Sequence, residues 1–185
     1  MPPVTAVAAG MASSSVPDGF VIRRAHARDA AALVALAEEV AAEPGGWLIA
    51  DGGWRTAADE RRYLRALRRY RDAAVFVAEA GDDGIVGRLS LGRDPHPASR
   101  HVADLGVMVA AAFRRRGVGR ALLRESVEWA RDVGVRKLEL HVFPHNEPAI
   151  ALYEEFGFRR EGYRKAHYRR GHEFLDAILM AYDVN

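Results

Sequence analysis

The chain has 185 residues, of which 49% are hydrophobic and 28% are charged, and these proportions are ordinary for a globular domain. It contains no cysteine, which excludes a disulfide scaffold, a thiol nucleophile and a cysteine-based metal site. The net charge of +2 does not require nucleic acid or a membrane surface as a partner. No apolar stretch approaches the roughly 18 residues of a membrane span.

Residues 1–19 are small and polar, and they lack the charged and apolar segments of a secretory signal. We expect a flexible tail over residues 1–19, with Met11 as an alternative start of translation. One domain should follow over residues 20–185, because no repeat or linker divides it. We expect this domain to work in the cytoplasm.

Hydrophobic periodicity along the domain alternates between the strand period and the helix period. The expected helices are residues 29–43, 57–71, 119–134 and 147–156. The expected strands are residues 20–24, 74–80, 85–93, 101–109, 137–143, 158–169 and 174–184. This order of elements predicts an α+β fold with a mixed, mostly antiparallel sheet.

Residues 113–120 read FRRRGVGR and join four arginines to two glycines at the start of the third helix. Glycine lets backbone N–H groups converge on one point, and a helix N-terminus favours an anion. The side chains of Arg114, Arg115, Arg116 and Arg120 could pair with phosphate oxygens. The stretch therefore predicts a site that holds a pyrophosphate group.

Three kinds of nucleotide site could use this turn. A P-loop requires Lys followed by Ser or Thr, and no such pair follows these glycines. A dinucleotide site requires GxGxxG directly after a strand; here residues 110–116 intervene and the third glycine is missing, although Glu139 lies at a suitable distance downstream. The third kind is a coenzyme A site, and two further observations favour it.

Two motifs resemble those of the GCN5-related N-acetyltransferases. In VMVAAAFRRRGVGRALL, Arg114, Gly117 and Gly119 fill the fixed positions of the family's acetyl-CoA motif, Q/R-x-x-G-x-G/A. NEPAIALYEEFGFRREG matches the second signature, N-x-x-A-x-x-L-Y-x-x-x-G-F. The matching residues are Asn146, Ala149, Leu152, Tyr153, Gly157 and Phe158. The resemblance covers about residues 20–184, and the two motifs stand in the family's order.

The resemblance implies a sheet of six to seven strands with about four flanking helices, splayed between strands 4 and 5. The pantetheine arm of acetyl-CoA would lie in that slot, residues 114–120 would hold the pyrophosphate, and Tyr153 would lie beside the thioester sulfur. The implied coenzyme-binding residues are Val107, Val109, Arg114, Arg115, Arg116, Gly117, Val118, Gly119, Arg120, Asn146 and Tyr153.

Acetyl transfer to an amine requires a neutral amine, a donor for the developing oxyanion and a proton for the departing thiolate. We expect Tyr153 to be the general acid, because a phenol with a pKa near 10 keeps its proton at neutral pH. The resemblance places a general base on the fourth strand, where Asp104 and His101 are candidates on opposite faces. The second-rank candidates are Glu38, Glu39 and Glu43.

Several other polar and aromatic residues are candidates for the acceptor side. Trp47 and Trp54 could line the acceptor pocket or pack over the sheet, and Tyr168 and Asp176 could meet the amine. The four downstream histidines have no metal-like spacing, so we expect no metal site. These histidines are His141, His145, His167 and His172.

Taken together, the sequence predicts an acetyl-CoA-dependent N-acetyltransferase. We expect direct attack on the thioester by a primary amine of a small molecule or of a protein N-terminus. The alternative is a non-catalytic acyl-CoA-binding sensor on the same fold. Nucleic acid is not an expected partner, because Leu64 and Leu67 make the arginine-rich segment 61–71 an ordinary amphipathic helix. The resemblance is also compatible with a homodimer.

Overall fold

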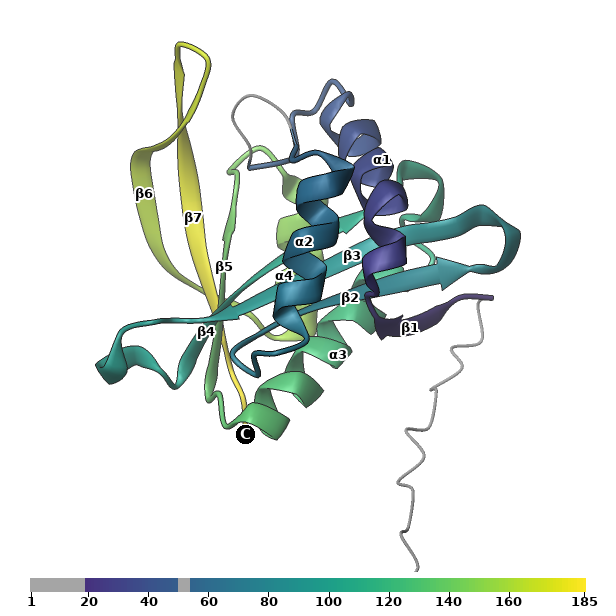
Figure 1. Ribbon diagram of the computed structural model, residues 1–185. Helices are drawn as coiled ribbons and strands as arrows, with labels where there is room; N and C mark the ends of the chain where they lie inside the picture. The colour runs from purple at the N-terminus through teal and green to yellow at the C-terminus, as the bar shows by residue number, and fades with distance from the viewer. Residues whose placement is uncertain (1–18, 50–53) are drawn as a thin grey trace, which may run out of the picture.

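The computed structural model describes residues 19–49 and 54–185, so the expectations for the tail and for Met11 lie outside the described residues. The strands are β1 Val21–Arg24, β2 Ala73–Ala80, β3 Gly84–Arg93, β4 Val102–Val109, β5 Lys137–Val142, β6 Arg159–Arg170 and β7 Glu173–Asp183. The α-helices are α1 Ala30–Ala41, α2 Ala57–Leu67, α3 Val118–Val133 and α4 Glu147–Phe156. Over the described residues, the strands form one sheet in the order β1-β2-β3-β4-β5-β7-β6 (Figure 1).

The strands β4 and β5 diverge in the middle of this sheet. They pair in parallel only from Val102 opposite Lys137 to Asp104 opposite Glu139. Beyond Asp104, β4 pairs only with β3, and beyond Glu139, β5 pairs only with β7. The facing edges of the two strands therefore carry backbone groups without a partner strand. The mixed sheet and the splay between strands 4 and 5 are confirmed.

Helices cover both faces of the sheet (Figure 1). On one face α1 and α2 pack on the sheet through buried side chains that include Leu33 and Leu64. On the other face α3 buries Leu122, Leu123 and Val127 in the largest core cluster. Burial of Leu64 agrees with an amphipathic α2, although this helix ends at Leu67, four residues earlier than expected.

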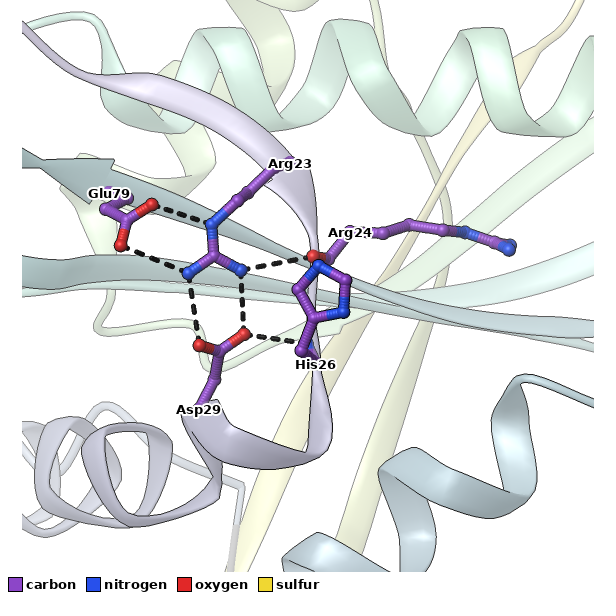
Figure 2. A network of polar contacts seen from close by, with 5 residues as sticks. All are labelled: Arg23, Arg24, His26, Asp29 and Glu79. Carbon is purple, nitrogen blue, oxygen red and sulfur yellow. Dashed lines mark hydrogen bonds and ion pairs between the residues drawn. The ribbon is translucent and has the colours of Figure 1, made fainter. Parts of the chain in front are cut away.

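A network of charges fixes the start of α1 against the edge of the sheet (Figure 2). The Nε of Arg23 in β1 donates to Glu79 Oε2 in β2 at 2.7 Å. The other nitrogens of Arg23 donate to both carboxylate oxygens of Asp29, which also accepts from the N–H of His26 at 2.7 Å. Burial opposes the ionisation of Asp29, but these hydrogen bonds outweigh it and lower the pKa of Asp29 from 3.8.

Asp29→Asn should lower the free energy of unfolding by about 2 kcal/mol at pH 7, because a buried charge-assisted network is lost. The folded pKa of Asp29 lies below its unfolded value of 3.8. The contribution of ionised Asp29 to the stability of the fold is therefore fully present above pH 3.8, and it is lost as the pH falls through the folded pKa. Urea unfolding at pH 7 and near pH 3 measures the difference, with exposed Asp82→Asn as the control. An equal difference at both pH values would contradict this assignment.

Candidate functional site

A cavity of about 930 Å³ lies where β4 and β5 diverge. Its walls come from the end of α1 and the loop after it, from α2, from strands β2 to β6, from the turn before α3, and from α4. The expected coenzyme residues that line it are Val107, Val109, Arg114, Arg115, Gly117, Gly119, Arg120, Asn146 and Tyr153. Because the cavity occupies the gap between unpaired strand edges, backbone groups and side chains can both face a ligand there.

The turn before α3 brings backbone N–H groups and arginine side chains to one wall of this cavity. Gly117 has a φ of 85° and precedes the first residue of α3, whose first-turn N–H groups have no partner within the helix. Gly117, Gly119, Arg115 and Arg120 all line the cavity, so backbone donors and two guanidinium groups are available to one anion. These groups fit a pyrophosphate.

Three residues of this turn also make packing contacts within the protein. The side chain of Val118 is buried in the core, with 1% of its surface exposed, and the guanidinium of Arg116 lies over the ring of Phe113 at 4.6 Å. A Cβ on Gly119 would lie 2.8 Å from Leu152 Cδ2. Glycine at position 119 therefore allows α3 to approach α4, in addition to any role in ligand binding.

Arg114 is held by protein groups. Its two terminal nitrogens donate to the carboxylate oxygens of Glu43 at 2.6 and 2.7 Å, and its Nε donates to the carbonyl of Val109 at 3.0 Å. Glu43 also accepts from the indole N–H of Trp47 at 2.8 Å. The hydrogen bonds from Arg114 lower the pKa of Glu43, which makes Glu43 a poor general base.

The helix α4 positions Asn146 and Tyr153. The side chain of Asn146 caps the helix by accepting from the N–H of Ala149 at 3.3 Å. Tyr153 lies two turns further along, with 7% of its surface exposed, and its hydroxyl makes no hydrogen bond with the described residues. Burial raises the pKa of Tyr153 to about 12. The group is therefore a protonated phenol whose O–H is available to a ligand.

A second group of lining residues comes from β4, β5 and β6. Burial lowers the pKa of His141, and the nearby charges of Arg164 and His167 lower it further. The imidazole is therefore neutral at neutral pH, and its Nδ1 is hydrogen-bonded to the hydroxyl of Tyr168 at 2.5 Å. Its Nε2 makes no hydrogen bond with the described residues. A neutral imidazole with one free nitrogen can accept a proton.

Asp104 also lines the cavity, at the last residue pair before β4 and β5 diverge. It is open to the cavity, yet the surrounding protein desolvates its carboxylate and raises its pKa, as do the charges of Glu139 and Asp94. This brings the pKa of Asp104 closer to neutral pH, where a base is most effective.

Other candidates lie outside the lining of the cavity. His101 is exposed before the start of β4, and its carbonyl accepts hydrogen bonds from the N–H groups of Arg136 and Lys137. Asp176 accepts from the hydroxyl of Tyr163 and the N–H of Ala166. Glu38 and Glu39 are likewise exposed on α1 and do not line the cavity.

Aromatic side chains form another part of the wall. Trp47, Trp54 and Tyr63 line the cavity, and the ring of Trp54 also packs under the guanidinium of Arg88 at 4.9 Å. Trp54 therefore lines the cavity and also packs over the sheet, so the two alternatives expected for it occur together. The indole of Trp47 is fixed by Glu43.

His141 is the residue that sequence reasoning missed. It lies two residues after Glu139, which pairs with Asp104, and strand alternation puts Glu139 and His141 on the same face. The alternation in KLELHVF is a signal for this face, but only the parallel pairing of β4 with β5 shows that the face borders the cavity.

Metal and membrane sites are not found in the described part of the chain. No three histidine or carboxylate side chains among residues 19–49 and 54–185 gather to hold a metal ion. None of the helices in these ranges combines the length and the apolar character needed to cross a bilayer.

Comparison with known proteins gives consistent results. The chain is 40% identical over 104 residues to the L-amino acid N-acetyltransferase AaaT of Escherichia coli. The aligned segment covers 54% of this chain and 62% of AaaT. It is 37% identical over 124 residues to the N-alpha-acetyltransferase RimI of Mycobacterium tuberculosis, covering 65% and 71% of the two chains.

A solved structure of yncA from Salmonella typhimurium with its cofactor acetyl-CoA superposes with a TM-score of 0.78. The sequence identity is 21%, and the superposition covers 90% of this chain and 95% of yncA, so it shows a shared fold. Residues 38–158 match the sequence model of the acetyltransferase (GNAT) family. The chain therefore belongs to the acetyltransferase (GNAT) family.

Proposed function

We propose that the protein is an N-acetyltransferase that transfers the acetyl group of acetyl-CoA to a primary amine. The observation that carries this proposal is the cavity between β4 and β5, which has backbone N–H groups and arginine side chains at the start of α3 and a buried, unpartnered Tyr153 hydroxyl. Acetyl-CoA, when bound, supplies an activated acetyl group as a thioester. Family membership and the names of the relatives AaaT and RimI support the activity.

The coenzyme would be held by groups of this chain that line the cavity. The first-turn N–H groups of α3, with Arg115 and Arg120, would bind the pyrophosphate. The unpaired edge of β4 at Val107 and the amide of Asn146 would contact the pantetheine arm. Arg114 would act indirectly, because its guanidinium already binds Glu43 and the Val109 carbonyl.

Two side chains would move protons. The Nε2 of His141 would accept a proton from the acceptor amine, which must be neutral to attack, and Asp104 would favour the resulting imidazolium through its negative charge. Tyr153 would donate its phenolic proton to the departing sulfur, because burial keeps this group protonated. His101 has no part in this proposal, because it does not line the cavity.

The acceptor is proposed as a primary amine of a small molecule or of a protein N-terminus. AaaT is named for L-amino acids and RimI for alpha-amino groups, so both classes occur among the relatives. The aromatic wall of Trp47, Trp54 and Tyr63 favours an acceptor with an apolar group next to the amine. No observation favours the alternative of a non-catalytic sensor. The cytoplasmic location and the homodimer stay predictions.

Thiol release from acetyl-CoA tests the proposal. The acceptor panel should contain polyamines, amino acids, aminoglycosides and short peptides, including ribosomal N-termini. Release with one class would support an N-acetyltransferase and identify its acceptor chemistry. Silence with every amine, while acetyl-CoA still raises the melting temperature, would contradict the proposed catalysis with these acceptor classes.

A further inference from the structure

A bulge in β6 lies next to the proposed site. The strands β6 and β7 are in register where Arg164 faces Ala177 and again where Tyr168 faces Leu175. Four steps along β6 therefore correspond to two steps along β7, and residues 165–167 form a bulge with two extra residues. Ala166 has a φ of 49°, which residues other than glycine rarely adopt. The bulge therefore needs contacts that hold it.

Asp176 of β7 supplies such contacts. Its Oδ1 accepts from the N–H of Ala166 at 2.7 Å, and its Oδ2 accepts from the hydroxyl of Tyr163 at 2.7 Å. These two hydrogen bonds lower the pKa of Asp176, so it is an ionised and strong acceptor at neutral pH. Asp176 therefore binds the backbone of the bulge directly, at the residue with the positive φ.

Asp176 lies behind the cavity. Strand alternation places it on the face opposite to Leu175 and Ala177, which are the partners of Tyr168 and Arg164. Tyr168 lines the cavity and Asp176 does not. Any effect of Asp176 on the cavity must therefore pass through the bulge.

The bulge determines where Tyr168 lies along the hairpin. Without the two extra residues, Tyr168 would face Glu173 of β7. The bulge shifts Tyr168 by two positions along β7, from Glu173 to Leu175, which is about 7 Å at the rise of a strand. This shift brings Tyr168 closer to His141, which faces Leu179 of β7. In this position the Tyr168 hydroxyl reaches His141 Nδ1, and the ring of His167 from the bulge lies 5.2 Å from the imidazole.

We propose that Asp176 is a positioning residue for His141. Asp176 holds the bulge, the bulge places Tyr168, and the Tyr168 oxygen accepts from His141 Nδ1–H. In this tautomer Nε2 keeps a free lone pair for the proton of the acceptor amine, whereas donation from the Tyr168 hydroxyl to Nδ1 would leave Nε2 protonated and inactive as a base. The inference rests on the proposed function of His141 as general base.

The charged groups around His141 and Tyr168 contribute to the pH dependence of the site. The titratable or charged groups near His141 and Tyr168 are Glu139 on β5, Asp104 on β4, and Arg164 and His167 on β6. Loss of the bulge should move Tyr168 and His167 away and expose the imidazole to water. The pKa of His141 should then rise toward its ordinary value of 6.5.

The kinetic test uses Asp176→Ala, Tyr168→Phe and the double variant. Each single variant should lower kcat/KM by about tenfold, with an unchanged dissociation constant for acetyl-CoA. Asp176→Ala should also move the acidic limb of the pH profile to higher pH. The double variant should be no worse than Tyr168→Phe alone, because both changes remove the same contact. Additive losses, or an unmoved acidic limb, would overturn the proposal.

Two further variants separate positioning from folding. Asp176→Asn keeps an oxygen for the Ala166 N–H, so it should retain more activity than Asp176→Ala when the two are compared per amount of folded protein, measured by circular dichroism. Tyr163→Phe removes one hydrogen bond from Asp176 but keeps the bulge contact, and it should stay within about twofold of wild type. Equal losses in the asparagine and alanine variants would overturn the proposal.

A spectroscopic measurement tests the same inference without turnover. Nitrogen chemical shifts in protein with ¹⁵N-labelled histidine report the tautomer of each imidazole, and His141→Gln identifies the signal of His141. Wild type should show protonation at Nδ1, Asp176→Ala should shift the signal toward a mixture, and Asp176→Asn should shift it less. An unchanged signal would overturn the positioning by Asp176. Absence of thiol release from wild type would instead overturn the proposed function.

Discussion

Tyr153→Phe should lower kcat by more than about tenfold, because it removes the proton offered to the departing sulfur. The dissociation constant for acetyl-CoA should change little, because the ring and its packing against Phe158 remain. Burial raises the pKa of Tyr153 to about 12, so the hydroxyl should stay protonated up to about pH 10. Deprotonation of Tyr153 should therefore not lower the rate below that pH.

Steady-state kinetics and isothermal titration measure these two effects separately. Tyr182→Phe is a matched control, because Tyr182 also packs in the aromatic cluster with Phe156 and Phe158 but does not line the cavity. An unchanged kcat in Tyr153→Phe would remove this residue from the mechanism.

His141→Gln should lower kcat/KM by about a hundredfold, because the acceptor amine loses its proton acceptor. A base acts in its deprotonated form, so wild-type activity should fall as the pH drops through the pKa of His141. Burial and the charges of Arg164 and His167 place that pKa below 6.5. The acidic limb of the profile should therefore lie below pH 6.5 in wild type and disappear in the variant.

Pairs of conservative variants identify the base. His101→Gln removes the same functional group outside the cavity and should leave the pH profile unchanged. Asp104→Asn should lower the rate by a smaller factor but keep an acidic limb. If the limb instead disappears in Asp104→Asn and persists in His141→Gln, Asp104 is the base and the proposed assignment is wrong.

Much of the fold could be predicted from local sequence signals. Hydrophobic periodicity gave the strands and helices, because each element buries one stripe or face. The glycines that begin and end α3 gave its limits, since Gly117 and Gly134 both adopt a positive φ. The splay between β4 and β5 followed from the resemblance, because no local pattern shows where two strands stop pairing.

The site was harder to predict, because its residues depend on contacts between distant segments. Arg114 resembles a phosphate ligand in the motif, yet Glu43, which lies 71 residues earlier, takes both of its terminal nitrogens. His141 borders the cavity because β5 pairs with β4, and the partner of its Nδ1 is Tyr168, which lies 27 residues later on an irregular strand. Pairings of this kind leave no spacing that a single sequence reveals.

The strand β6 forms one border of the sheet and is exposed along nearly its whole length. A twofold pairing of two copies through this border would bring a cationic edge against itself. The positive residues along it include Arg159, Arg160, Arg164, Lys165 and Arg170. Like charges placed opposite one another destabilise paired strands, and natural proteins use such charges to protect exposed edges. The same arginines should therefore prevent the sheet from continuing into a neighbouring molecule.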